Sequence, residues 1–142
     1  MPSTLNPYLN FRASAREAMD FYQSVFGGEV QRSTFAEFQM AQDPADNDLI
    51  MHSQLTSPSG FTLMAADVPE HMELNQGNNI SISLSGDDEA ELTGYWEKLV
   101  DGGTVIEQLA KAPWGDSFGM AIDRFGIQWL VNIAGTPQGA AG

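Results

Sequence analysis

The side chains of this sequence that could take part in chemistry include two histidines. His52 lies in the run Ile-Met-His-Ser-Gln-Leu, where it could ligate a metal ion or act as a general base. It could equally be a hydrogen-bonded histidine of the core. Strand alternation would place His52 on the same face as Ile50 and Gln54, and this more polar face could line a cavity. His71 lies in a polar stretch and is expected to be a solvated loop residue.

A carboxylate and three aromatic residues complete the set of candidates. Asp67 ends the run Leu-Met-Ala-Ala-Asp, where it could act as a base, orient a ligand, or simply close a strand as a turn residue. Trp114 and Trp129 could stack on an aromatic or quinone-like ligand, although Trp129 could also be a core residue. Tyr8 could present its hydroxyl group to a cavity, or pack in the core or a dimer interface.

Several other chemistries lack the residues that they need. The chain has no cysteine, which excludes disulfides, thiol nucleophiles and thiolate metal sites. There is no glycine-rich phosphate loop, no G-x-S-x-G elbow and no H-E-x-x-H motif. A glycine-rich turn after a first parallel strand, which would cradle the nucleotide of a methyltransferase, is also absent.

Length, composition and charge limit the remaining classes. The 142 residues fit a single domain, or two small halves, and 42% hydrophobic residues can form a core. The net charge of −13 repels phosphate backbones and anionic lipids, so we expect no nucleic-acid or membrane partner. No apolar run approaches the length of a membrane span, and the N-terminal stretch does not resemble a signal peptide. These features predict an acidic, cytoplasmic protein.

A repeated pattern predicts the elements that hold the candidate residues. Ser14 and Glu17 form a capping pair before an amphipathic stripe that ends at Gly27-Gly28. Asp88 and Glu91 stand at the same spacing before a second stripe, which ends at Gly102-Gly103, 75 residues later. We therefore predict two helices of similar length, one in each half of the chain.

Strand-like runs surround both helices in the same order. A strand is expected before each helix, at 7–11 and 80–85, and three are expected after each helix, at 29–38, 49–56 and 61–67 and at 104–110, 117–123 and 127–133. This predicts one α+β domain of two βαβββ modules, residues 5–67 and 79–134. Residues 68–78 would link them, and residues 135–142 would form a loose tail. Two such modules would enclose a central cavity between curved mixed sheets.

The doubled pattern resembles the vicinal oxygen chelate superfamily of glyoxalase I, bleomycin-resistance proteins and extradiol dioxygenases. Within it the chain is most similar to the PhnB-like, demethylubiquinone methyltransferase-like branch. The resemblance rests on PYLNF, EAMDFYQSVFGGE, IMHSQL, LMAAD, WGDSFG and DRFGIQW, which cover residues 7–133 in order. It implies a homodimer and, in metal-using members, two metal ligands from each half that stabilise charge on the substrate.

The ligand positions implied by the resemblance lack metal-binding side chains. They fall at Asn6 or Pro7, at Asn79, at Leu130 and, with an uncertain register, at Asp67. Only Asp67 offers a carboxylate, so we predict that the protein holds no metal ion and no other cofactor. Asn79 remains a candidate ligand-binding residue.

The leading prediction is a metal-free protein that binds a small, partly aromatic molecule between its sheets. The predicted ligand-binding residues are Tyr8, His52, Asp67, Asn79, Trp114 and Trp129. Whether it also catalyses a reaction, by acid–base chemistry, is left open. Two alternatives remain: a divalent-metal lyase or dioxygenase with a shifted ligand set that includes His52 and Asp67, and a structural dimer whose interior is filled.

Overall fold

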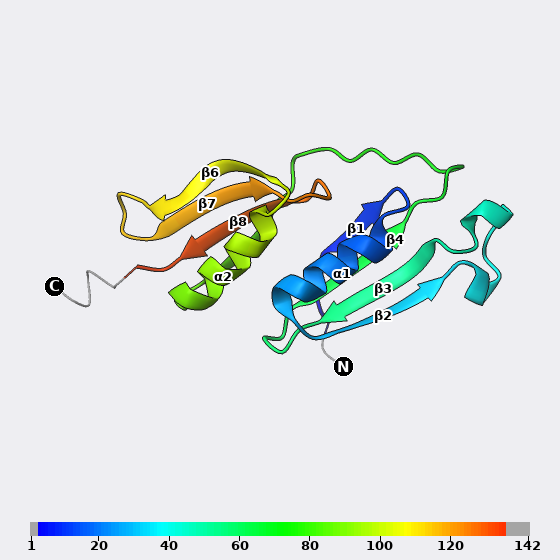
Figure 1. Cartoon of the computed structure of the whole chain (residues 1–142), viewed down its shortest axis with the longest axis horizontal. Helices are drawn as coiled ribbons and strands as arrows, with labels where there is room; N and C mark the ends of the chain where they lie inside the picture. The colour runs from blue at the N-terminus through cyan, green and yellow to red at the C-terminus, as the bar shows by residue number, and fades with distance from the viewer. Residues whose placement is uncertain (1–2, 136–142) are drawn as a thin grey trace. The chain divides into compact units, whose positions relative to one another are not determined.

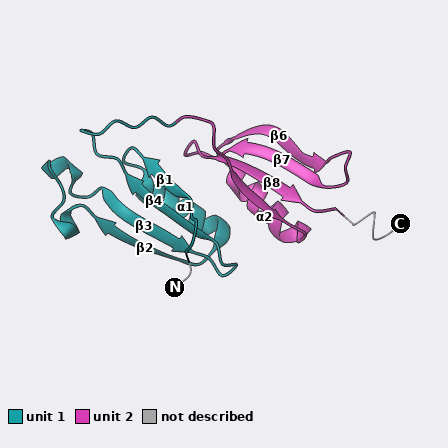
Figure 2. Cartoon of the chain, turned by 180° about the vertical axis from the view of Figure 1, so that it is seen from behind, with its two compact units in different colours: residues 1–76 teal, residues 77–142 magenta. Residues whose placement is uncertain are grey.

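The computed structural model describes residues 3–135, which contain every predicted strand and helix. The chain divides into two compact units, residues 1–76 and 77–142, and each is described by itself (Figure 2). The first unit contains β1 (Tyr8–Phe11), α1 (Ala15–Phe26), β2 (Glu29–Thr34), η1 (Ala36–Phe38), η2 (Pro44–Asp46), β3 (Ile50–Thr56) and β4 (Thr62–Asp67). The second contains β5 (Ile82–Gly86), α2 (Glu89–Val100), β6 (Thr104–Lys111), β7 (Ser117–Ile122) and β8 (Gln128–Ile133).

Each unit is a four-stranded mixed sheet with one helix packed on one face (Figure 1). The strand order is β1-β4-β3-β2 in the first unit and β5-β8-β7-β6 in the second. In both, the strand before the helix pairs in parallel with the last strand, and the other pairs are antiparallel. The predicted α+β fold of two βαβββ modules is confirmed.

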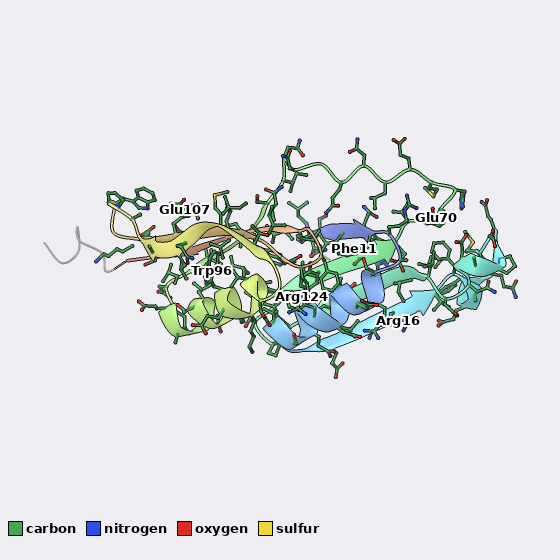
Figure 3. The ribbon with its side chains drawn as sticks, turned by 45° about the horizontal axis from the view of Figure 1, so that its top comes forward. Phe11, Arg16, Glu70, Trp96, Glu107 and Arg124 are labelled. Atoms are coloured by element: carbon green, nitrogen blue, oxygen red, sulfur yellow. The ribbon has the colours of Figure 1, made fainter. Side chains whose placement is uncertain are left out.

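Both helices bury one face against their own sheet. The first core contains Phe11, Met19, Tyr22, Leu55 and Ala65, and the second contains Leu84, Trp96, Trp129, Val131 and Ile133. Figure 3 labels one member of each, Phe11 and Trp96. Because each helix covers only one side, its sheet keeps an opposite face without a helix, and we call this the open face of the unit.

The glycine pairs have a tertiary role beyond ending the helices. Gly28 has φ +93°, and a Cβ there would lie 2.0 Å from the carbonyl oxygen of Thr56. A Cβ on Gly103 would lie 2.3 Å from the carbonyl oxygen of Ile122. The second glycine of each pair therefore lets the chain pass close to the neighbouring strand as the next strand begins.

The two helix starts differ, and one prediction is wrong. Asp88 caps α2 as expected, since its carboxylate accepts a hydrogen bond from the Glu91 N–H at 3.0 Å. The Ser14 side chain makes no capping hydrogen bond to α1. The Ala15 N–H instead donates to Asp67 Oδ1 at 2.9 Å, so a residue from the end of β4 satisfies this helix start.

The other differences from the predicted elements are small. The strand expected at 29–38 ends at Thr34, and η1 follows it. Ile80 is 79% exposed and precedes the strand that was expected to include it. The Arg12 guanidinium donates to the carbonyl oxygens of Val68, Pro69 and Met72, which ties the start of the predicted linker to the first unit. The predicted loose tail lies, beyond Gly135, outside the described residues.

Candidate functional site

The open face of the first unit brings together two predicted site residues from distant parts of the chain. Tyr8 on β1 and His52 on β3 both project from this face, with Tyr8 Oη 3.4 Å from His52 Nδ1. The ring centroids lie 5.8 Å apart and the ring planes are inclined by 36°. Between the two strands runs β4, in which Met64 is the residue paired with Tyr8.

The electrostatics of this pair favour a neutral tyrosine. Burial raises the pKa of the Tyr8 hydroxyl group above its usual value, because desolvation disfavours the phenolate. The Tyr8 ring is nevertheless 46% exposed, and His52 is half-buried. The pair therefore offers a protonated hydroxyl group, an imidazole and an accessible aromatic surface at one place.

Asp67 has a structural role at the end of β4. Its carboxylate is 5% exposed and accepts two backbone hydrogen bonds, from the Ala15 N–H to Oδ1 and from the Ile50 N–H to Oδ2, both at 2.9 Å. These bonds join the start of α1 to the start of β3. Each carboxylate oxygen is thus held by the fold, and a ligand or a transferred proton would have to displace a buried N–H.

Asp67 and His52 lie on opposite faces of the same sheet. Asp67 faces α1, as its bond to Ala15 requires, whereas His52 contacts Tyr8 on the open face. The two side chains therefore cannot bind the same metal ion. The structure does not support the alternative of a divalent-metal lyase or dioxygenase that uses His52 and Asp67 together as ligands. Within residues 3–135, no group of three or more His, Asp or Glu side chains is arranged to hold a metal ion.

The residues at the positions implied for the superfamily's metal ligands do not fit a divalent ion. Leu130 lies in β8 on the open face of the second unit, paired with Ser83 and Met120. It is a hydrocarbon side chain, and the remaining positions offer an amide, a proline and the occupied carboxylate of Asp67. No step of chemistry is therefore assigned to a metal ion.

Trp129 requires a correction, because it lies in the core of the second unit. It is 2% exposed, and its indole N–H donates to Asp123 Oδ2 at 2.8 Å. Asp123 Oδ1 accepts from the N–H groups of Phe125 and Ile127 in the β7–β8 turn. Alternation in β8 directs Trp129, Val131 and Ile133 toward α2, so Trp129 belongs to the core and not to the open face.

The two remaining candidates are solvent-exposed and apart from any core. Trp114 is 68% exposed in the β6–β7 loop. Asn79 is exposed and precedes β5 by three residues. Of the three predicted residues in the first unit, Tyr8 and His52 are brought into contact, and Asp67 lies on the opposite face of the sheet.

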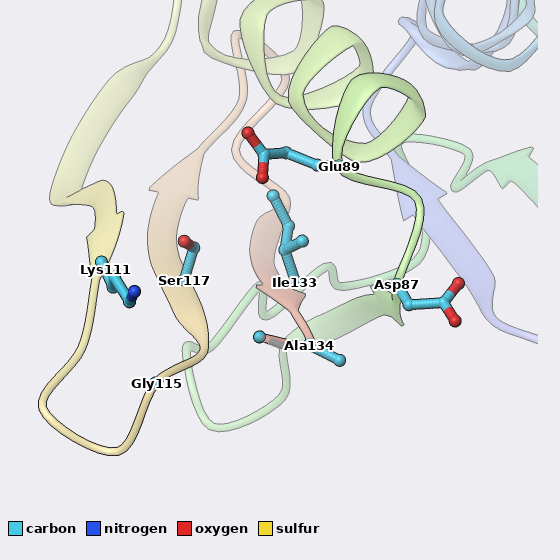
Figure 4. Close-up of a pocket in the computed structure, with 8 residues that line it drawn as sticks. Asp87, Glu89, Lys111, Gly115, Ser117, Ile133 and Ala134 are labelled. Atoms are coloured by element: carbon cyan, nitrogen blue, oxygen red, sulfur yellow. The ribbon is translucent and has the colours of Figure 1, made fainter. Parts of the chain in front are cut away.

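A polar cavity at one end of the second unit was not anticipated from the sequence. It has a volume of about 390 Å³ and is lined by Asp87, Glu89, Lys111, Gly115, Ser117, Ile133, Ala134 and Gly135 (Figure 4). These residues come from the loop before α2, the β6–β7 hairpin and the end of β8. The sequence contains little that would predict this cavity, because Lys111 lies opposite Ser117 only through the pairing register of the β6–β7 hairpin.

Asp116 fixes the wall of this cavity and should give a measurable pH effect. Its carboxylate accepts hydrogen bonds from the Gly135 N–H at 2.9 Å and from the Asn132 amide at 3.2 Å. The pKa of Asp116 lies below the ordinary value of 3.8, first because of the Gly135 bond and then because of the Asn132 bond. The carboxylate form is thereby favoured in the folded protein.

We expect Asp116 to contribute stability that is fully present above pH 3.8 and lost as the pH falls through its lower folded pKa. Carboxyl-carbon NMR titration should therefore give a midpoint for Asp116 below that of a free aspartate. The Asp116→Asn variant should show a weaker loss of stability in this acid range. A midpoint at or above the ordinary value would contradict the role of the two hydrogen bonds.

No helix among residues 3–135 has the length and apolar character needed to cross a membrane.

Comparison with known proteins agrees with the topology. The sequence profile of the 3-demethylubiquinone-9 3-methyltransferase family matches residues 3–132. Protein PA1353 from Pseudomonas aeruginosa is 36% identical, with a TM-score of 0.79 over 94% of this chain and 98% of its own.

Two further solved structures extend the likeness. A PhnB protein from Bacillus cereus is 23% identical, with a TM-score of 0.71 over 93% of this chain and 100% of its own. A glyoxylase/bleomycin resistance protein/dioxygenase domain from Frankia sp. EAN1pec shares the fold at 12% identity, with a TM-score of 0.62 over 94% of this chain and 98% of its own. The chain belongs to the 3-demethylubiquinone-9 3-methyltransferase family, and it shares the fold of the PhnB protein and of the glyoxylase/bleomycin resistance protein/dioxygenase domain.

Proposed function

We propose that this protein binds a small, partly aromatic molecule on the open face of its first unit, at Tyr8 and His52, without a resident metal ion. The observation that carries the proposal is the 3.4 Å approach of Tyr8 Oη to His52 Nδ1 on a sheet face that no helix of the unit covers. Assembly into a homodimer and a cytoplasmic location remain predictions from the sequence.

The chemistry of the pair indicates the kind of ligand. An aromatic ring stacked on Tyr8 or His52 would gain about 0.5–1.5 kcal/mol beyond the area that it buries. A tyrosine hydroxyl group is protonated at neutral pH, and burial raises the pKa of Tyr8 further, so this hydroxyl group can donate to a carbonyl, quinone or phenol oxygen. Millimolar to micromolar affinity needs about 4–8 kcal/mol, so apolar burial must supply the rest.

Ligand binding is favoured here over the transfer of a methyl group. In the described residues each sheet is antiparallel except for one parallel pair, and the turn after β1 contains no glycine-rich cradle for a nucleotide cofactor. The absence of a metal ion is proposed because Leu130 and Asn79 are poor ligands and Asp67 is occupied by two N–H groups.

The proposal is tested by titrating the full-length protein with benzoate, catechol and a water-soluble benzoquinone. We expect saturable NMR shifts in Tyr8 and His52 for at least one compound, with an affinity that EDTA leaves unchanged. Tyrosine and histidine signals are the suitable readout, because all three tryptophans belong to the second unit. Tyr8→Phe should weaken the binding of an oxygen-bearing ligand about fivefold, since a hydrogen bond at a partly exposed site is worth about 1 kcal/mol.

Matched variants separate a local effect from a general one. Tyr95→Phe makes the same change on α2, and His71→Gln serves as the control for His52→Gln. Neither control should alter the affinity. Saturable binding that is unaffected by both Tyr8→Phe and His52→Gln would contradict the assignment of this face, and binding abolished by EDTA would contradict the absence of a metal ion.

A further inference from the structure

The polar cavity of the second unit has two chemically different sides. It is formed entirely within that unit, so it shares no residue with the proposed site at Tyr8 and His52. In Figure 4, Lys111 and Ser117 lie on neighbouring strands at one side, Glu89 lies above Ile133, and Asp87 lies at the opposite side. The Glu89 carboxylate extends over Ile133 toward the side of Lys111 and Ser117, whereas the Asp87 carboxylate points outward, away from them.

On one side of the cavity, Lys111 carries a positive charge that is available to a ligand. Lys111 and Ser117 are direct cross-strand partners in β6 and β7, so their side chains are adjacent. No ion pair holds the Lys111 ammonium group within residues 3–135, whereas Arg32 and Arg124 are paired with Asp20 and Asp101. In a chain with 19 acidic and 6 basic residues, an unpaired lysine at a cavity is available to an anionic group.

The opposite side offers two carboxylates that the helix does not use. The capping role before α2 belongs to Asp88, whose carboxylate accepts the Glu91 N–H. Asp87 and Glu89 flank this cap, and both line the cavity. No hydrogen bond from the rest of residues 3–135 occupies either carboxylate.

We propose that this cavity binds a small amino-acid-like zwitterion, with its carboxylate at Lys111 and Ser117 and its ammonium group toward Glu89. A simple anion would meet the Glu89 carboxylate, and a simple cation would meet Lys111, so a molecule with both charges matches the site best. Ile133 and Ala134 would contact its carbon chain. The volume of about 390 Å³ lies within the usual range of small-molecule sites, about 300–1,000 Å³.

The test compares zwitterions with their separate halves on the full-length protein. Glycine, β-alanine and 4-aminobutyrate place the two charges at increasing separation, and acetate and methylammonium carry one charge each. We expect saturable NMR shifts in the amides of Lys111 and Ser117, and at least one zwitterion should bind about tenfold tighter than acetate or methylammonium. The effect should weaken at high salt, because the groups are partly exposed.

Substitutions at Lys111 and at Glu89 should weaken the binding of zwitterions in this cavity without affecting the site at Tyr8. Lys111→Met and Glu89→Gln should each weaken the tightest zwitterion about tenfold. Lys98→Met and Glu97→Gln make the same changes on α2 away from the cavity lining and should leave the affinity unchanged. Tyr8→Phe should have no effect, which separates this site from the proposed aromatic site.

Three results would overturn the proposal. The first is an absence of saturable shifts at Lys111 and Ser117 with all three zwitterions. The second is binding of acetate as tight as that of the best zwitterion, because the Glu89 carboxylate would then make no contribution. The third is an equal loss of affinity in the cavity variants and in their α2 controls.

Discussion

Replacing Trp129 by alanine is expected to lower the free energy of unfolding of the second unit by about 3–5 kcal/mol. The indole is 2% exposed and packs in the core between the sheet and α2, so its removal leaves a large cavity. The change also removes the N–H that donates to Asp123 Oδ2 at 2.8 Å. Urea unfolding followed by circular dichroism measures the loss.

Two variants serve as controls for this prediction. Trp129→Phe keeps most of the apolar volume but lacks the indole N–H, so we expect a smaller loss of about 1–3 kcal/mol. Trp114→Ala removes the same side chain from an exposed loop and should change the stability by less than about 0.5 kcal/mol. Equal losses for Trp129→Ala and Trp114→Ala would contradict the core position of Trp129.

The second large effect is expected at Asp67, whose carboxylate holds two buried N–H groups. Asp67→Ala leaves the N–H groups of Ala15 and Ile50 without this acceptor, and each lost partner costs about 1–3 kcal/mol. We therefore expect a total loss of about 2–6 kcal/mol in the first unit. Asp67→Asn should also destabilise, because its amide group presents an NH₂ to one of the two donors.

Hydrogen exchange gives the most direct measurement for Asp67. The amides of Ala15 and Ile50 should exchange much faster in Asp67→Ala than in the unmodified protein. Asp88→Ala removes an exposed cap of the other helix and should cost only about 1 kcal/mol. If the Ala15 and Ile50 amides kept their protection in Asp67→Ala, the anchoring role would be wrong, and Asp67 would again be available as a functional carboxylate.

Much of the fold followed from short-range patterns in the sequence. The apolar stripes of α1 and α2, the glycine pairs after them and the turn sequences between strands act over a few residues, so local spacing records them. The Asp88 cap joins residues only three positions apart and was predicted correctly. The repeat of these signals at 75 residues was enough to predict two βαβββ modules.

The site depended on contacts between distant segments and could be predicted only in part. Tyr8 and His52 were both candidates, but their contact arises because β4 lies between β1 and β3, an order that pairing of the whole sheet decides. Trp129 and Leu130 are neighbours in one strand, so they face opposite sides. Which of them faces a ligand depends on which side α2 covers, and local alternation does not record that choice.

The same limit explains the errors at Asp67 and Ser14. Ser14 has the right residue type and spacing for a cap, yet Asp67, 52 residues from Ala15, takes the N–H because the parallel pairing of β1 with β4 brings its carboxylate there. The cavity around Lys111 likewise joins a hairpin, a helix start and the end of a strand. The sequence by itself determined the elements and their order, because those depend on neighbouring residues. Only the tertiary structure decided which side chains are buried, paired or left free, because that depends on which segments the sheets bring together.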